Sequence, residues 1–268
     1  MADPALSRRQ RLGELVRSHG FLRVADASRL LGVSEVTVRA DLSLLEADGQ
    51  VTRVHGGAVP ARAVIESPLE QTVRQDADTK RRIGERAAAM VRSGESVLLD
   101  VGSTALAAAR ALVARDDLKD VVVLTNGLSI ALALEPAIPR VSVVVIGGTL
   151  RPLQHSLVDP HATDALSSIH ADVGLIGCNG VDAEAGVTNL NLAEAQVKRA
   201  MVRASARRIL LADASKLGGR HLGTIGSVED FDVLVTGGDP ADELLDPIRR
   251  RGVAVEVADP GQEAGARK

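Results

Sequence analysis

The stretch Gly32-Val33-Ser34-Glu35-Val36-Thr37-Val38-Arg39-Ala40-Asp41-Leu42 combines a tight turn with the start of an amphipathic helix. Glycine permits a sharp backbone turn, and Ser34 is a residue type that caps the first turn of a helix. Apolar residues then recur at helical spacing as far as Asp48. We therefore expect a helix over residues 35–48 that buries one stripe of side chains, namely Val36, Val38, Leu42 and Leu45.

Two shorter helices are predicted before this turn and a β-hairpin after it. Apolar spacing predicts helices over residues 6–18 and 24–31. Residues 50–54 alternate as a short strand, and His55-Gly56-Gly57 has the composition of a turn. Three helices with a tight turn between the second and the third, followed by a hairpin, are typical of a winged helix-turn-helix.

A winged helix-turn-helix places the start of its third helix in the major groove of DNA. Thr37 and Arg39 lie there, outside the apolar stripe, and arginine can donate in a fork to guanine or to phosphate. The candidate DNA-binding residues are Ser34, Thr37 and Arg39 on this helix, with Arg53 and His55 on the wing. The spacing alone leaves one alternative to DNA binding, namely a structural or protein-interaction module whose arginines are solvated.

These residues resemble the DeoR family of bacterial transcription regulators. The likeness is carried by Arg9-Gln10-Arg11, by residues 32–42 and by Arg53-Val54-His55-Gly56-Gly57-Ala58. The resemblance implies sequence-specific binding to operator DNA. The family's third helix usually has two successive arginines before Asp-Leu, whereas this chain has Ala40 in the second position, so a different operator or affinity is expected.

The rest of the chain has the pattern of a second, larger domain. We expect a DNA-binding domain over residues 1–60, a linker over 61–77 with little periodicity, an α/β domain over 78–258 and a disordered tail over 259–268. In the α/β domain, short β-branched or leucine-rich runs alternate with helices, which predicts a parallel, Rossmann-like doubly wound sheet. The predicted strands cover residues 97–100, 121–125, 141–146, 173–176, 209–212 and 233–235.

Polar, glycine-rich loops follow most of these predicted strands. Ligands of open α/β sheets bind at the carboxyl ends of the strands, and a free helix amino terminus binds anions. We therefore expect a pocket for a small polar ligand, with a lysine supplying charge to a phosphate. The candidate residues are Asp100, Gly102, Ser103 and Thr104; Thr125 and Asn126; Gly147 and Gly148; Asn179 and Gly180; and Lys216.

This half also resembles the sensor domain of the DeoR family, from about Lys80 to Gly237. The resemblance adds Lys198 to the candidate pocket and implies a fold similar to ribose-5-phosphate isomerase. It further implies an effector that is a phosphorylated sugar or polyol, and usually repression that the effector releases. The chain departs from the family at Gly237, where Asp is usual, and near Asp159, where Gly is common.

An isomerase carrying a DNA-binding head is the alternative function. Isomerisation needs a carboxylate that moves a proton between adjacent carbons. By alignment to the isomerase, its glutamate falls at or beside Lys198 and its paired aspartates near Ile176 and Asn179, none of them acidic. Glu194, one turn from Lys198, keeps the alternative open. We expect a sensor with no catalytic residue and no cofactor, and we rank a ligand-free scaffold last.

Composition and charge narrow the class of protein further. The 268 residues have a net charge of −3, but residues 1–62 hold nine arginines against seven acidic residues, so the head is mildly basic. One cysteine excludes an intramolecular disulfide, the six histidines lack metal-ligand spacing, and GxGxxG and P-loop motifs are absent. Without an apolar run for a membrane span or a signal peptide, we expect a cytoplasmic protein with no metal. We expect a homo-oligomer, dimer or tetramer, because two DNA-binding heads can then match two operator half-sites.

Overall fold

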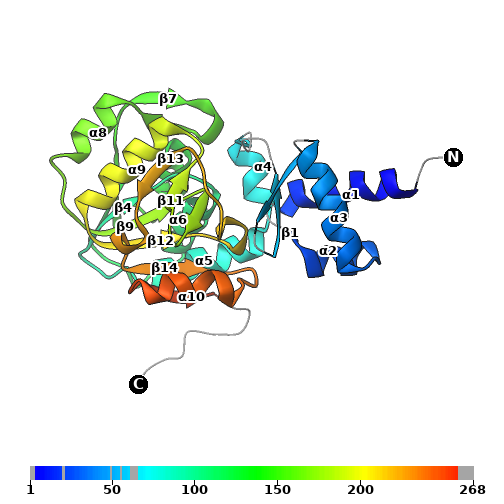
Figure 1. The fold of residues 1–268 in the computed structure, drawn as a ribbon. Coiled ribbons are helices and arrows are strands. Elements are labelled where there is room, and N and C mark those ends of the chain that lie inside the picture. Colours follow the sequence, from blue (N-terminus) through cyan, green and yellow to red (C-terminus); the bar gives the residue numbers. More distant parts are fainter. Residues whose placement is uncertain (1–3, 20–21, 49, 55, 61–65, 259–268) are drawn as a thin grey trace, which may run out of the picture. The chain divides into compact units, whose positions relative to one another are not determined.

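A computed structural model describes residues 4–19, 22–48, 50–54, 56–60 and 66–258 of the chain (Figure 1). Contacts between residues divide the chain into two compact units, Met1–Ile65 and Glu66–Lys268. Each unit has its own core of apolar side chains, and each is described by itself below.

The first unit is a winged helix-turn-helix, as predicted. Its helices are α1 (Pro4–His19), α2 (Val24–Leu31) and α3 (Glu35–Ala47). A small antiparallel sheet has the order β1 (Leu22–Arg23), β3 (Gly57–Pro60), β2 (Val51–Val54). The helices and the sheet close over one core, which includes Leu12, Val16, Ala27, Val38, Leu42, Leu45 and Val51.

The turn before α3 forms as the residue types predict. Gly32 ends α2 in the left-handed conformation, with φ of 66°, and Ser34 caps α3 by accepting a hydrogen bond from the Thr37 amide at 3.2 Å. The predicted burial of Val36 is wrong, because this residue is 73% exposed. It lies two residues before buried Val38, which turns it about 200° around the helix and onto the outer face.

A short helix, α4 (Leu69–Arg74), lies where the sequence predicts linker. At six residues it is too short for periodicity to be visible, and Leu69 is its one buried residue. Pro68 occupies the N-cap position. The start of the predicted linker, residues 61–65, and the predicted tail, 259–268, lie outside the described residues.

The second unit is built on a parallel sheet of seven strands, which confirms the predicted doubly wound architecture. All neighbouring strands are parallel. Six of the strands match the predicted runs, whereas the edge strand β15 was not predicted because Glu256 interrupts its short apolar run. The order across the sheet is β15 (Ala254–Val257), β14 (Val233–Thr236), β12 (Ser205–Leu211), β9 (Ala171–Gly177), β4 (Ser96–Leu99), β5 (Val121–Thr125), β6 (Val141–Val145).

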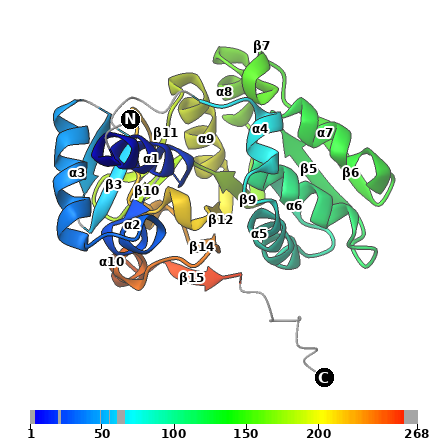
Figure 2. The same ribbon diagram turned by 90° about the vertical axis from the view of Figure 1, so that its right-hand side faces the viewer.

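Helices cover the two faces of this sheet and create two apolar layers (Figure 2). One layer packs α5 (Ala77–Ala89), α6 (Ser103–Val113) and α7 (Leu128–Leu134) against alternate strand residues such as Leu99 and Leu175. The other packs α8 (Pro160–Leu166), α9 (Leu192–Ala204) and α10 (Asp242–Arg250) against their neighbours, such as Leu98 and Ile176.

Smaller strands lie at the carboxyl edge of the sheet. A hairpin of β7 (Thr149–Arg151) and β8 (Ser156–Val158) follows β6. An antiparallel sheet is formed by β10 (Gly180–Asp182), β11 (Gly186–Asn189) and β13 (Gly223–Gly226). The chain reverses its direction across the sheet between β6 and β9, so β4 and β9 form the switch point at which such folds bind ligands.

Candidate DNA-binding surface and effector site

The candidate DNA-binding residues of α3 lie on one exposed end of that helix. The Ser34 and Thr37 hydroxyls are 2.9 Å apart, and Ser34 caps the helix. The Arg39 guanidinium lies 2.8 Å from the Glu35 carboxylate, and the Arg39 side chain is 58% exposed. Arg39 is therefore held by a surface ion pair that solvent, or a phosphate, can replace.

Arg53 of the wing forms hydrogen bonds with two side chains of α3. Its Nε lies 2.7 Å from Glu46 Oε2, and its terminal nitrogen donates to Ser43 Oγ at 2.8 Å. Hydrogen bonds from the Arg53 amide and guanidinium lower the pKa of Glu46. The wing residue His55 lies outside the described residues. Sequence reasoning missed Asp41, which is buried inside α3 and accepts from Arg8 Nε of α1 at 2.6 Å.

A buried ion pair lies at the switch point of the larger sheet. Asp100 follows β4 and is fully buried, and its Oδ2 accepts from Lys198 Nζ of α9 and from the Gly177 amide at 2.9 Å. Burial raises the pKa of Asp100, against the opposing charge of Lys198. Burial alone would lower the pKa of Lys198, but the Asp100 and Glu194 carboxylates raise it. Lys198 therefore keeps its charge at neutral pH.

Two buried acceptors beside this pair have no hydrogen-bond partner among the described residues. They are Asp100 Oδ1, after β4, and Asn126 Oδ1, after β5. The other side of the Asn126 amide donates to the Leu157 carbonyl at 2.9 Å. Buried acceptors are rarely left unpaired in native proteins, so these two oxygens point to a donor that the protein does not supply.

The amino end of α6 is open at the same edge. Gly102 precedes the helix with φ of 106° and supplies no side-chain cap. The first-turn amides of a helix have no partner within it, and Ser103 and Thr104 add hydroxyls in partly exposed positions. A side chain at Gly102 would meet nothing within 4 Å, which leaves room in front of the helix.

Lys216 follows β12 in a short 3-10 helix, Ala214–Lys216. Asp213 accepts from the Ser215 amide at 2.9 Å, and in the described part of the chain Lys216 forms no ion pair. Burial lowers the pKa of Lys80 and of His221, and the positive charge of Lys216 lowers both further.

The other candidate residues mainly shape loops. Thr125 Oγ1 accepts from the Gly127 amide at 3.0 Å, and Asn179 Oδ1 accepts from the Leu190 amide at 2.9 Å. A Cβ at Gly148 or Gly180 would lie within 2.5 Å of a backbone oxygen, so both glycines are needed for close packing, whereas one at Gly147 would meet nothing within 4 Å.

A cluster of charged residues that the sequence did not reveal lies beside Lys198. Glu194 is 4% exposed, and its Oε1 accepts from Arg151 at 2.8 Å and from Ser156 Oγ at 2.6 Å. Arg151 also pairs with Glu66, at the start of the second unit. The members are far apart in sequence, from residue 66 to residue 194, so spacing could not have found them.

The β7–β8 hairpin makes two more contacts with the segment that follows Glu66. Gln154 Nε2 donates to the Ser67 carbonyl at 2.8 Å, and His155 Nε2 lies 3.3 Å from Glu70 Oε1. The hairpin therefore joins the carboxyl edge of the sheet to the residues by which the chain enters this unit.

The structure shows the surroundings of Asp159 and Gly237, the two residues at which the chain departs from the family pattern. Asp159 has φ of 77° and ψ of −176°, a conformation that favours glycine. The Gly237 carbonyl accepts from the Ala214 amide at 2.8 Å, and a Cβ there would lie 3.3 Å from the Ala258 oxygen.

The described residues provide neither a reactive thiol nor a cluster of metal ligands. Burial raises the pKa of the Cys178 thiol to about 12, so the thiolate that a nucleophile needs is not formed at neutral pH. The described part of the chain holds no group of three or more metal-ligating side chains. None of the described helices combines the length and apolarity needed to cross a membrane.

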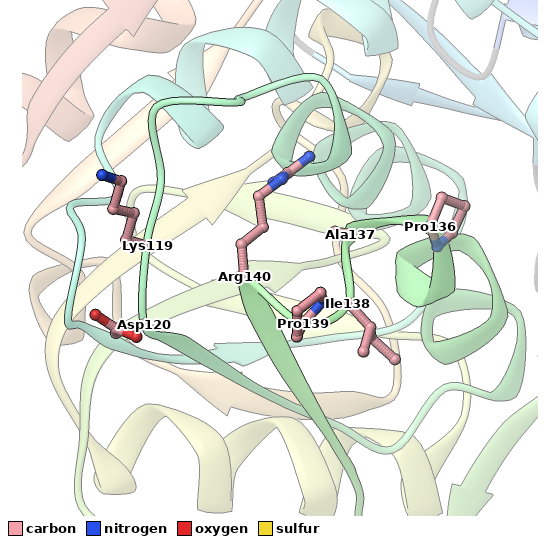
Figure 3. A pocket seen from close by; sticks show the side chains of 7 residues that line it. All are labelled: Lys119, Asp120, Pro136, Ala137, Ile138, Pro139 and Arg140. Carbon is pink, nitrogen blue, oxygen red and sulfur yellow. The ribbon is translucent and has the colours of Figure 1, made fainter.

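A hollow shown in Figure 3 lies away from the candidate site. Lys119 and Asp120 precede β5, and Pro136 to Arg140 precede β6, so the hollow lies at the amino edge of the sheet. The candidate effector residues follow the strands at the opposite, carboxyl edge.

Two family models match this chain. Residues 8–63 match the DeoR-like helix-turn-helix domain, and residues 75–238 match the DeoR C terminal sensor domain. Solved structures with a similar arrangement include ribose 5-phosphate isomerase from Plasmodium falciparum, with 18% identity, 51% of each chain covered and a TM-score of 0.38. The sorbitol operon regulator SorC from Klebsiella pneumoniae has 13% identity, covers 92% of this chain and 100% of its own, and has a TM-score of 0.37.

Three curated relatives cover nearly the whole chain. The HTH-type transcriptional regulator GlpR of Haloferax volcanii is 35% identical over 92% of this chain and 96% of its own. HTH-type transcriptional regulator GolR of Listeria innocua is 29% identical, covering 94% and 98%. The glycerol-3-phosphate regulon repressor of Escherichia coli K12 is 25% identical, covering 91% and 95%. With both of its domains matched, this chain belongs to the DeoR family of DNA-binding transcriptional regulators.

Proposed function

We propose that this regulator is a repressor of carbohydrate-metabolism genes whose DNA binding is controlled by a phosphorylated sugar or polyol. The observation that carries the proposal is an open helix amino end, at α6, on the same edge of the sheet as Lys216, which forms no ion pair with the described residues. Relatives named as glycerol-3-phosphate regulon repressors support this class of effector.

The effector's phosphate lies, in this proposal, between Gly102, Ser103 and Thr104 on one side and Lys216 on the other. The two groups follow β4 and β12, which are separated by β9, so the strand ends lie about 10 Å apart. The helix end supplies fixed amide donors and partial positive charge, and Lys216 supplies the full charge that a dianion requires.

The hydroxyl groups of the effector would meet the unpaired acceptors at the switch point. Asp100 Oδ1 and Asn126 Oδ1 are buried acceptors, and a sugar or polyol supplies O–H donors. Lys198 holds the Asp100 carboxylate in place. Thr125, Gly147, Gly148, Asn179 and Gly180 shape the loops around this space.

Operator DNA would be contacted by α3 and the wing. Arg39 is the exposed cation on the helix end, and Arg53 is fixed beside it through Glu46 and Ser43. Ser34 and Thr37 lie at the same end of α3, where hydroxyls and amides can meet phosphate. His55 is proposed on its position in the wing sequence alone.

Replacing Arg39 by Ala is expected to weaken operator binding by roughly 1–3 kcal/mol and to relax sequence preference if Arg39 reads a base. Gel-shift titration of the full-length protein measures this effect. Arg29→Ala is the matched control, because Arg29 is an exposed arginine of α2 that pairs with Asp26. Equal operator affinities for wild type and Arg39→Ala would remove Arg39 from the interface.

We propose that the sensor domain has no isomerase activity. A general base needs a carboxylate free to take a proton, but Glu194 is buried and already accepts from Arg151 and Ser156. By alignment the isomerase base falls at or beside Lys198, which is bound to Asp100. Conversion of ribose 5-phosphate to ribulose 5-phosphate that is lost in Glu194→Gln would establish the opposite.

Effector and DNA are proposed to communicate as linked binding events in a cytoplasmic homo-oligomer, a dimer or tetramer. The contacts from Arg151, Gln154 and His155 to residues 66–70 support a route, because they join the effector edge to the chain's entry from the DNA-binding unit. A change in the hairpin would then alter how that segment is held.

A thermal-shift screen of the full-length protein against phosphorylated sugars and polyols tests the proposed effector class. A ligand that binds only the folded state raises the melting temperature, and the rise grows with the logarithm of the ligand concentration divided by its dissociation constant. The same compound is expected to reduce operator binding in a gel shift. The unphosphorylated parent sugars are the control, and a screen in which they act as strongly as the phosphates would contradict the proposed phosphate site.

A further inference from the structure

Val36 occupies a position that neither packing nor helix formation explains. It is the second residue of α3, is 73% exposed and lies outside the apolar cluster of the DNA-binding unit. Valine is also a poorer helix former than alanine, because its branched side chain loses rotamer freedom. An exposed valine here is therefore explained by a contact outside the free protein.

The residues around Val36 form an apolar strip within a polar frame. Arg39, Ala40 and Ser43 are three, four and seven residues further along, on the same side of the helix. The Arg39 side chain pairs with Glu35, while Ser43 donates to the Arg39 carbonyl and accepts from Arg53. Val36, Ala40 and Leu44, each one turn from the next, are exposed and carry no polar group, and of these Val36 and Ala40 lie nearest the start of the helix, which is the end proposed to enter the major groove.

We propose that Val36 and Ala40 read the 5-methyl groups of two thymines in each operator half-site. Thymine is the base that presents a methyl group in the major groove, and apolar side chains recognise it by contact. The two Cβ atoms lie about 5–6 Å apart, which corresponds to thymines about one or two base steps apart. Ala40 makes this contact where an arginine would select guanine. The inference rests on the proposed docking of α3 in the major groove.

The test compares thymine with deoxyuridine, which lacks the methyl group and pairs identically. A duplex selected by the full-length protein from a random-sequence pool is resynthesised with each thymine replaced singly, and dissociation constants are measured by fluorescence anisotropy. Burial of one methyl group is expected to change the dissociation constant roughly fourfold. Wild type is expected to lose this factor at the thymine facing Val36. Val36→Ala is expected to bind both duplexes equally, because it lacks the two γ-methyl groups that reach this thymine, whereas Ala40 contacts its own thymine through Cβ.

Three further proteins make the result decisive. Leu44→Ala removes another exposed apolar side chain of α3, 48% exposed, and is expected to keep the thymine preference. Ala40→Arg is expected to select guanine in place of the second thymine. Arg39→Ala tests the docking of α3 separately. If Arg39→Ala weakens binding but wild type does not discriminate thymine from deoxyuridine, α3 docks and the methyl contacts are wrong.

Discrimination between thymine and deoxyuridine that persists in Val36→Ala also overturns the proposal. The melting temperature of Val36→Ala, expected at or above wild type, shows that the fold is intact.

Discussion

Lys216 is the residue on which the proposed phosphate contact depends most directly. Lys216→Met keeps the apolar stem and removes the charge, so effector binding is expected to weaken by about 1.5–3 kcal/mol, or roughly ten- to a hundredfold. Operator binding without effector should be unchanged. Calorimetric titration with the sugar phosphate that most stabilises wild type in the thermal-shift screen measures the loss.

The matched control for this substitution is Lys119→Met. Lys119 is an exposed lysine at the amino edge of the sheet, in the hollow of Figure 3. An effector affinity that is equal in wild type and Lys216→Met would place the phosphate elsewhere. A similar loss in both variants would show that net charge, not position, accounts for the effect.

Single residues could be predicted where their role follows from local sequence. Ser34 caps α3 and Gly102 opens α6 because capping and turning depend on immediate neighbours. The partners of Glu194 and Asp100 depend on which strands become adjacent, and this information is not local. The apolar character of Val36 predicts burial, but its angle around α3 turns it outward.

At the level of elements, the start of α8 carries a measurable cost. Asp159 precedes this helix at φ of 77° and ψ of −176°, without a side-chain cap hydrogen bond. A non-glycine residue in this region costs about 1–3 kcal/mol, whereas glycine loses up to about 1 kcal/mol through its freedom in the unfolded chain. Asp159→Gly is therefore expected to stabilise the sensor domain by about 1 kcal/mol in urea unfolding.

Asp164→Gly provides the comparison of opposite sign. Asp164 lies inside α8 and is exposed, and glycine there should destabilise the helix by roughly 0.5–1 kcal/mol. Destabilisation by both substitutions would mean that Asp159 is not strained. The effector response of Asp159→Gly also shows whether this departure from the family pattern shapes the pocket.

Elements with strong periodicity were predictable and short ones were not. The six predicted strands are runs of β-branched residues and leucine, and this composition indicates a parallel sheet even though β6 is largely exposed. The unpredicted elements α4, β15, β7 and β8 have six, four, three and three residues, and tertiary contacts hold them. Arg151 and Gln154, for example, stabilise the hairpin through residues 66 and 67.

At the level of the whole molecule, β5 and β6 expose apolar residues of the sheet. Val122 is 36% and Val144 is 44% exposed, and β6 is an edge strand without a charged residue. Parallel sheets are normally covered on both faces, and exposed edges normally carry charge. An uncharged edge can pair with its own copy without repulsion, which supports the proposed homo-oligomer.

Val144→Glu is expected to reduce the oligomer to a smaller species in sedimentation velocity at micromolar concentration. Because Val144 is part-exposed in the free chain, the melting temperature should fall little unless association itself stabilises the fold. Leu222→Glu, at a residue 78% exposed elsewhere, is the control. If the oligomer of Val144→Glu has the same mass as that of wild type, the oligomer contact lies on another surface.

The strand order also fixes a sequence of events during synthesis on the ribosome. β4 can pair with β5 soon after both emerge, but its other neighbour, β9, is complete only at Gly177, about 80 residues after β4. At about 5–20 residues per second, the inner edge of β4 waits roughly 4 to 16 s for that neighbour. During this interval Leu98 and the unpaired backbone of β4 are accessible to other nascent chains. β4, which lies inside the finished sheet between β9 and β5, is therefore an open edge while the protein is being made, and a chaperone that covers this edge would prevent association at that stage.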